Sequence, residues 1–372
     1  MTEARPIRRI LMTADTIGGV WTYAMELAHA LSRHQIQIAL AVMGAALTSY
    51  QRQQCRRIPN LQVYESTYKL EWMEDPWGDI ERAADWLLAL ERDLAPDVIH
   101  LNSYAHGQLP WNEPCVMVGH SCVLSWWSAV RGRTAPREWD RYRRQVTWGI
   151  RAADFVVAPT RAMLSELDRC YGPLRASAVI ANARTAARYH PARKEPFVLA
   201  AGRIWDEAKN ISLLCDAAPE IEWPVLVAGD DTHPNGGRRP MENVTALGHL
   251  TEEELAEYYA RAGIFCSPAR YEPFGLSILE AALSGCALVL GDLPSLRENW
   301  GGVAVFVSPD DRESFLFHVR ELISSPGRRA SLACAAYARA RMFTPERMAE
   351  AYEAAYRQAL QSASPAALIH GV

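Results

Sequence analysis

Two carboxylates flank a glycine in the second half of the chain: Glu272 and Gly275 lie close together, and Glu280 follows. A glycine where a loop enters a helix lets an anion approach free backbone N–H groups, and the helix dipole favours negative charge there. Glu280 stands ~7.5 Å further along such a helix, at ~1.5 Å per residue. Its carboxylate is too far away to serve a phosphate but can accept two hydrogen bonds from a ribose diol. With Glu272 holding sugar hydroxyls, the pattern indicates a sugar-nucleotide site.

The elements around these residues support this interpretation. An apolar strand is expected at 263–266 and is stopped by Pro268, and a helix is expected at 276–284. Taken singly, Glu280 is better explained as a surface helix residue and Glu272 as a loop charge. The pair together with Gly275 favours a ligand site.

Glu272-Pro-Phe-Gly275 followed by Glu280 resembles the Glu-x7-Glu signature of retaining glycosyltransferases of family 4, which have the GT-B fold. The resemblance implies an α/β protein with two Rossmann-like domains facing across a cleft and a C-terminal helix that crosses back to the first domain. It implies transfer of a sugar from a UDP-, GDP- or ADP-sugar to a glycan, glycolipid or small metabolite, with no cofactor and no metal. It also assigns Phe274, Gly275 and Leu276 to donor binding.

A second glycine motif lies near the N-terminus. Gly18 and Gly19 separate an expected strand at 9–14 from a helix with an apolar face. This geometry also presents backbone N–H groups to an anion, although a tight turn alone can require glycine. The motif is not the Gly-x-Gly-x-x-Gly fingerprint, so a nicotinamide dehydrogenase is disfavoured. The family resemblance implies that Gly18 and Gly19 face the diphosphate and the acceptor.

Polar residues follow two expected strands of the first half. Asn102, Tyr104 and His106 come after the strand at 97–101, at the edge where α/β proteins bind ligands, and are acceptor candidates. His120 ends the next strand. A histidine at a strand end is more often structural than catalytic. The resemblance reverses that preference, because family 4 members have a histidine near the reactive carbon of the donor sugar.

Two cations accompany the first strand of the second half. Arg203 and Lys209 lie between that strand and the next helix, and both suit a pyrophosphate. The resemblance assigns them to the donor diphosphate, where they would stabilise the charge of the leaving group. The alternative is that Lys209 forms a salt bridge with Asp206 or Glu207.

Tryptophan and arginine alternate between Trp126 and Trp148. The arginines, Arg131 to Arg144, could bind an anionic lipid surface or a phosphate-bearing acceptor, which makes peripheral membrane contact one interpretation. A solvated helix at 136–151 with its tryptophans packed inward is slightly favoured.

Length and composition set the wider limits. The 372 residues suit two domains, and 49% hydrophobic and 22% charged residues describe a soluble globular protein. A net charge of −4 argues against nucleic-acid binding. Eight scattered cysteines without a Cys-x-x-Cys pair favour reduced thiols in the cytoplasm over zinc or disulfides. No Asp-x-Asp or spaced His/Cys cluster indicates a metal site.

The best domain boundary is the polar, proline-bearing segment after Asn182. We expect an acceptor-side domain at 1–190, a nucleotide-sugar domain at 191–343 and a returning helix at 344–372. Relatives have Asn-Gly-Val-Asp at this boundary, whereas here Ala183 replaces the glycine and Thr185 the acid. Residues 231–240 are expected to form an exposed loop.

Two other functions fit the same motifs. A sugar-nucleotide epimerase of this fold would isomerise the donor without an acceptor, and a non-catalytic nucleotide-sugar-binding protein would bind it without turnover. The pattern of His120, Arg203 and Lys209 favours the transferase. The donor base and sugar, the acceptor and the oligomeric state are not indicated by the sequence.

Overall fold

The computed structural model describes residues 5–232, 236–237 and 241–363, which form two compact units. Within the described residues, the first unit comprises 5–125, 134–181 and 345–363. The second comprises 126–133 and the described part of 182–344. Each unit contains one parallel sheet with the strand order of a Rossmann-like fold. The expected fold class is therefore confirmed.

The first unit is built on a seven-stranded sheet of order β3-β2-β1-β4-β5-β6-β7. Its inner strands are buried on both faces, as helix-covered parallel strands must be. The strands are β1 Arg9–Asp15, β2 Gln37–Met43, β3 Leu61–Glu65, β4 Val98–Leu101, β5 Cys115–Val118, β6 Phe155–Ala158 and β7 Ser177–Val179. The α-helices are α1 Gly19–Leu31, α2 Ser49–Arg56, α3 Trp77–Leu94, α5 Asp140–Ala152, α6 Arg161–Tyr171 and α13 Pro345–Ala363, and α4 Val123–Arg131 extends into the second unit.

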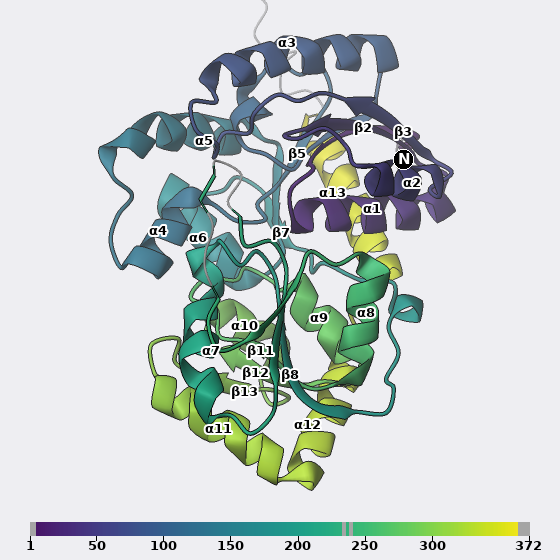
Figure 1. Cartoon of the computed structure of the whole chain (residues 1–372). Helices are drawn as coiled ribbons and strands as arrows, with labels where there is room; N and C mark the ends of the chain where they lie inside the picture. The colour runs from purple at the N-terminus through teal and green to yellow at the C-terminus, as the bar shows by residue number, and fades with distance from the viewer. Residues whose placement is uncertain (1–4, 233–235, 238–240, 364–372) are drawn as a thin grey trace, which may run out of the picture. The chain divides into compact units, whose positions relative to one another are not determined.

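The second unit is built on a six-stranded sheet of order β10-β9-β8-β11-β12-β13. In Figure 1, α8 and α9 lie on one side of this sheet, and α7 and α11 lie on the other. The strands are β8 Glu195–Ala201, β9 Val225–Ala228, β10 Thr245–Gly248, β11 Ala262–Ser267, β12 Ala287–Gly291 and β13 Val305–Val307. The helices are α7 Ile211–Ala217, α8 Glu252–Arg261, α9 Leu276–Leu283, α10 Pro294–Trp300, α11 Arg312–Ser324 and α12 Pro326–Ala340.

The last helix, α13, belongs to the first unit, as expected of a C-terminal helix that returns there. Tyr352 and Tyr356 on α13 are fully buried. Their rings pack against His100 on β4, and Tyr352 also packs against Tyr23 on α1. Aromatic burial of this size fixes α13 firmly to the sheet and to α1.

The tryptophan- and arginine-rich stretch differs from the expectation. The helix α5 begins at Asp140 rather than at 136, and α4 precedes it. Trp148 is 50% exposed, so the prediction that the tryptophans pack inward is wrong for this residue. Arg131 pairs with Glu207 at 2.7 Å and lies over the rings of its neighbouring tryptophans.

Part of the loop expected at 231–240 lies outside the described residues, namely 233–235 and 238–240. Among the helices that are described, none combines the length and the apolar character needed to span a bilayer.

Candidate active site

The carboxyl ends of β8, β9 and β10 approach one another closely. The Gly202 amide donates to the Ala228 carbonyl at 3.0 Å, and the Gly229 amide donates to Gly248 at 2.8 Å. A Cβ on Gly229, whose φ is 135°, would lie 1.8 Å from the Gly202 oxygen. Glycine is thus required at Gly229, and it brings together the loops that carry Arg203 and Asp230.

Two residues predicted for the donor site meet in the second unit. The Lys209 ammonium lies 2.5 Å from the Glu272 carboxylate. The two side chains are only 18% and 11% exposed, so this is a largely desolvated ion pair. The alternative predicted for Lys209 was a partner at Asp206 or Glu207, and the structure instead pairs it with the other predicted site residue.

Hydrogen bonds fasten the two loops that carry this ion pair. Asn210, which is 2% exposed, donates to the carbonyls of Pro268 at 3.0 Å and Pro309 at 2.8 Å. Arg270 donates to the Asn210 side chain at 2.6 Å, and its own amide donates to Ala208. The spacing between Lys209 and Glu272 is therefore set by buried bonds on both sides.

Arg203 is held apart from that pair. Its guanidinium contacts Asp206 at 3.0 Å and lies over the Trp205 ring, and 41% of its side chain is exposed. Asp206 also caps the following turn through the Ala208 amide and accepts the Trp126 indole N–H at 3.1 Å. Arg203 thus remains accessible to a ligand, while its Asp206 partner is fixed.

The α9 N-terminus lies directly after Glu272. Gly275 precedes the helix with a φ of 87°, a left-handed conformation that glycine adopts without strain, and no side chain caps the helix. Phe274 is 4% exposed and packs edge-on against Phe343, which anchors the loop, whereas Leu276 is partly exposed. The expected helix N-terminus led by glycine beside Glu272 is present, and the structure adds the Lys209 cation next to it.

Glu280 is far more buried than a surface helix residue would be. It is 9% exposed, and its Oε1 lies 2.9 Å from Nε of Arg184, a residue that is 2% exposed in its side chain. Burial raises the pKa of Glu280 above its ordinary value, and Arg184 opposes that rise. The interpretation of Glu280 as a solvated helix charge is excluded.

In the first unit, His120 and Asn102 are brought together. His120 Nε2 lies 2.8 Å from Asn102 Oδ1. The Asn102 amide nitrogen donates to the Thr13 carbonyl at 2.7 Å, which only an NH₂ group can do, so the Asn102 oxygen must face His120. His120 therefore donates from Nε2, and in its neutral form it carries its lone pair on Nδ1.

The same asparagine oxygen joins a larger buried network. His100 Nε2 lies 3.3 Å from Asn102 Oδ1, and His100 Nδ1 lies 2.7 Å from the Tyr356 hydroxyl. Burial lowers the pKa of both His100 and His120 to about 3, and His100 adds to the effect on His120. Both imidazoles are neutral near pH 7, so His120 offers Nδ1 as an acceptor.

Two acceptor candidates are buried rather than open to a ligand. His106 is 1% exposed, its Nε2 faces the Ile80 carbonyl at 3.2 Å, and burial lowers its pKa to about 4. Tyr104 is 5% exposed and donates to the Ser121 carbonyl at 2.7 Å. Gly18, with a φ of 86°, precedes α1, which begins at Gly19 and has no side-chain cap.

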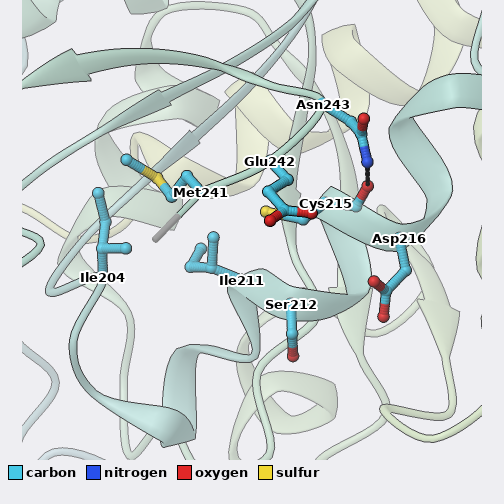
Figure 2. A pocket seen from close by; sticks show the side chains of 8 residues that line it. All are labelled: Ile204, Ile211, Ser212, Cys215, Asp216, Met241, Glu242 and Asn243. Carbon is cyan, nitrogen blue, oxygen red and sulfur yellow. Dashed lines mark hydrogen bonds between the residues drawn. The ribbon is translucent and has the colours of Figure 1, made fainter. Parts of the chain in front are cut away.

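A pocket of about 160 Å³ lies in the second unit. Figure 2 shows its lining, which comes from α7, from residues 241–243 and from Ile204 in the loop after β8. Asn243 donates to the Cys215 carbonyl at 3.3 Å. The lining residues are Ile204, Ile211, Ser212, Cys215, Asp216, Met241, Glu242 and Asn243. None is a predicted site residue, and the volume is below the ~300 Å³ at which ligand pockets begin. We assign no substrate to this pocket.

Within residues 5–232, 236–237 and 241–363, no group of three or more His, Cys, Asp or Glu side chains has the arrangement of a metal site.

The sequence did not identify Arg184, Asn210 or Arg270 as residues of the site. Arg184 stands at the position where the family pattern departs, and a charged residue in a segment bounded by small residues was the available signal. Asn210 directly follows Lys209 and adopts a left-handed conformation with φ 55°, for which asparagine is one of the preferred residues.

Two protein-family models match successive parts of the chain. Residues 17–188 match Glycosyltransferase Family 4, and residues 195–325 match Glycosyl transferases group 1. The two matches together run through most of the chain in family order. The chain belongs to the retaining glycosyltransferases of family 4.

Characterised relatives of this family 4 chain differ in function. Glycogen synthase of Mycobacterium tuberculosis is 27% identical over 64% of this chain, and the chain spans 63% of the length of that relative. D-inositol 3-phosphate glycosyltransferase of Kribbella flavida is 26% identical, with 96% of this chain and 97% of the relative covered.

Solved structures share the fold. Sucrose-phosphate synthase of Thermosynechococcus elongatus superposes with a TM-score of 0.80 at 18% identity, covering 95% of this chain and all (100%) of that one. HepE of Anabaena, solved with UDP-glucose, gives a TM-score of 0.72 at 16% identity, covering 93% and 98%. The GT-B fold of this family 4 chain is thus confirmed.

Proposed function

We propose that this family 4 chain transfers a hexosyl group from a nucleoside-diphosphate sugar to a hydroxyl acceptor, with retention of the anomeric configuration. The proposed donor residues are Arg203, Lys209, Glu272 and Glu280, and His120 is the proposed contact to the reacting sugar. The acceptor is a carbohydrate, a glycolipid or a small hydroxylated metabolite.

The observation that carries the proposal is the Lys209–Glu272 pair beside the α9 N-terminus. A diphosphate needs cations and N–H donors, which Lys209 and the amides after Gly275 provide. Sugar hydroxyls need an acceptor fixed in place, which the Glu272 carboxylate provides. These two requirements are met side by side in a sugar nucleotide.

The two cations also suit the departure of the nucleoside diphosphate from the sugar. Negative charge grows on the diphosphate as its bond to the sugar breaks, and Arg203 and Lys209 stabilise that charge without reorganising. We propose that they make a metal ion unnecessary. The departing phosphate oxygen then takes the proton of the acceptor hydroxyl, so that no separate general base is required.

His120 has a matching role in the first unit. Because Asn102 receives its Nε2–H, the neutral ring presents Nδ1, which accepts a hydroxyl proton in a hydrogen bond. We propose that this atom binds a hydroxyl of the reacting sugar. UDP-glucose is the first donor to test, since HepE was solved with it. A cytoplasmic location stays a prediction.

The test is a panel of UDP-, GDP- and ADP-sugars, with release of free nucleotide measured with and without a crude acceptor extract. Release from one donor, accelerated by the extract and giving a product of the donor's anomeric configuration, supports the proposal. Isomerised donor without acceptor would identify an epimerase instead, and binding without turnover would identify a binding protein.

Two variants tie the result to the site. Glu272→Gln keeps the shape of the side chain and a contact to Lys209 but removes the charge, so we expect transfer to fall at least tenfold. Glu313→Ala removes a carboxylate in the same unit whose side chain is 81% exposed, and should leave transfer unchanged. Equal activity in the wild type and in Glu272→Gln would contradict the role of Glu272.

A further inference from the structure

Arg184 is a buried cation in the loop that follows β7. Its residue is 2% exposed, although arginine is rarely buried without partners. The cost of removing a guanidinium from water is several kcal/mol unless carboxylates and hydrogen bonds compensate for it. The groups that offset this desolvation cost therefore indicate what Arg184 does at this position.

The partners of Arg184 come from two helices. On α9 it meets Glu280, with Nε 2.9 Å from Oε1, and on α8 it pairs with Glu252. Its Nε also donates to the Tyr189 hydroxyl at 3.0 Å, and its guanidinium lies 5.4 Å from the Tyr189 ring centroid. One guanidinium thus bridges two carboxylates and an aromatic hydroxyl.

The two carboxylates are not equivalent. Glu252 has a second cation, Arg188, at 3.0 Å, and Arg188 is about half exposed. The ion pair of Glu280 in the described part of the chain is with Arg184. Arg184 binds Oε1 of Glu280, and the hydroxyls of Tyr189 and Tyr259 also act on this carboxylate. Two carboxylate oxygens offer about four lone-pair sites, which leaves capacity for a further ligand.

Building on the proposed function, we propose that Arg184 is a positioning residue of the donor site, which holds the Glu280 carboxylate charged and oriented toward the ribose diol. A diol donates two hydrogen bonds, and bonds to an ionised acceptor are about twice as strong as neutral ones. Protonated Glu280 would lose part of this acceptor capacity. Arg184 prevents that loss without touching the ligand.

The charges around Glu280 determine how its ionisation responds to mutation. Burial and the Glu252 carboxylate raise the pKa of Glu280, while Arg184, Tyr189 and Tyr259 lower it. Removal of Arg184 raises that pKa, so the charged form is lost at a higher pH. Removal of the Glu252 charge lowers it. The two changes disrupt the same cluster but act on Glu280 with opposite signs.

The experiment is equilibrium binding of UDP, GDP and ADP between pH 5 and pH 8, by calorimetry, to the wild type, Arg184→Met and Glu252→Gln. For the nucleotide that binds, we expect Arg184→Met to weaken affinity about tenfold at pH 7. Its loss of binding on acidification should begin at least one pH unit above that of the wild type. In Glu252→Gln the loss should begin below the wild-type pH.

The 2′,3′-dideoxyribose form of the same nucleotide separates positioning from general damage. It lacks the diol, so the wild type and Arg184→Met should bind it equally. If the two variants shift the acid limb in the same direction, or if Arg184→Met weakens both ligands by the same factor, Arg184 has a structural role and the inference is wrong.

Two further results of these experiments have a different meaning. Absence of binding of every nucleotide to the wild type would overturn the proposed function itself. If Arg184→Met does not fold, Arg184→Lys keeps a cation and should give an intermediate upward shift of the acid limb. Glu252→Gln must still show its downward shift, and failure to do so refutes the role of Arg184.

Discussion

Replacing Asn102 with aspartate tests the state of His120. Asn102 faces His120 Nε2 with its oxygen at 2.8 Å, and its nitrogen donates to the Thr13 carbonyl at 2.7 Å. Aspartate keeps an acceptor for His120 but adds a negative charge and loses the donor to Thr13. The wild-type arrangement favours neutral His120, and the variant favours the protonated form.

The expected size follows from the geometry. A carboxylate within hydrogen-bond distance raises the pKa of an imidazole by about 1–3 units, each worth about 1.4 kcal/mol. Burial holds the pKa of His120 at about 3 in the wild type. In Asn102→Asp it should rise to about 4–6. Nδ1 then carries a proton at mildly acidic pH and no longer accepts a hydroxyl.

The assay is the pH dependence of sugar transfer between pH 3 and pH 8, a range that includes the His120 pKa of about 3 in the wild type. The acid limb of Asn102→Asp should begin about 1–3 pH units above that of the wild type. Asn60→Asp is the matched control, because Asn60 is also buried in the first unit and also donates to main-chain carbonyls, at 3.0 and 2.6 Å. Asn60→Asp should be less stable than the wild type, but its transfer rate should fall at the same acidic pH as that of the wild type. An unshifted limb in Asn102→Asp would refute the tautomer argument.

Three further outcomes are expected. Lys209→Met leaves the Glu272 carboxylate buried and unpaired and removes a diphosphate contact, so the rate of transfer should fall about 10²-fold or more. A turnover assay in which the variant has the KM and kcat of the wild type would contradict this. Gly149→Ala places a Cβ 1.9 Å from a backbone carbonyl oxygen, so its thermal midpoint should fall by several degrees; an unchanged melting curve contradicts the packing. The depressed pKa values of His100 and His106, about 3 and about 4, favour the folded state above the unfolded pKa of about 6.5, and this contribution is lost as pH falls toward 4. Urea unfolding should therefore show stability falling by about 2.7 kcal/mol per pH unit below pH 6 from these two histidines, with His120 adding to the fall, and an unchanged urea midpoint at pH 5 would contradict it.

The regular elements were readily predicted from local pattern. The helix at 276–284 and the strand at 263–266 were predicted to within one or two residues, because apolar periodicity and the flanking glycine and proline are local signals. The strand β3, Leu61–Glu65, was not predicted, since it is partly exposed along its length and lacks a buried apolar run.

The pairings within the site were not predictable in the same way. Lys209 and Glu272 were each assigned to the donor, but their direct contact joins loops separated by 63 residues. Arg184 and Glu280 are likewise distant in sequence. Such contacts depend on the order of strands in the sheet, which single-residue patterns do not encode. His106 shows the opposite case, because a polar residue after a strand proved to be buried.

The first unit is completed by a segment from the far end of the chain. Its sheet is finished by β7 at residue 179, but α13, which covers Tyr23 and His100, begins only at Pro345. Domains usually fold in order from the N-terminus as the ribosome releases them. Here the second unit, which ends at Thr344, is synthesised before the helix that completes the first unit. During translation the apolar face of α1 and β4 therefore stays uncovered until α13 has been made. We expect chaperones to bind the first unit at this stage. A chain truncated before Pro345 should be prone to aggregation.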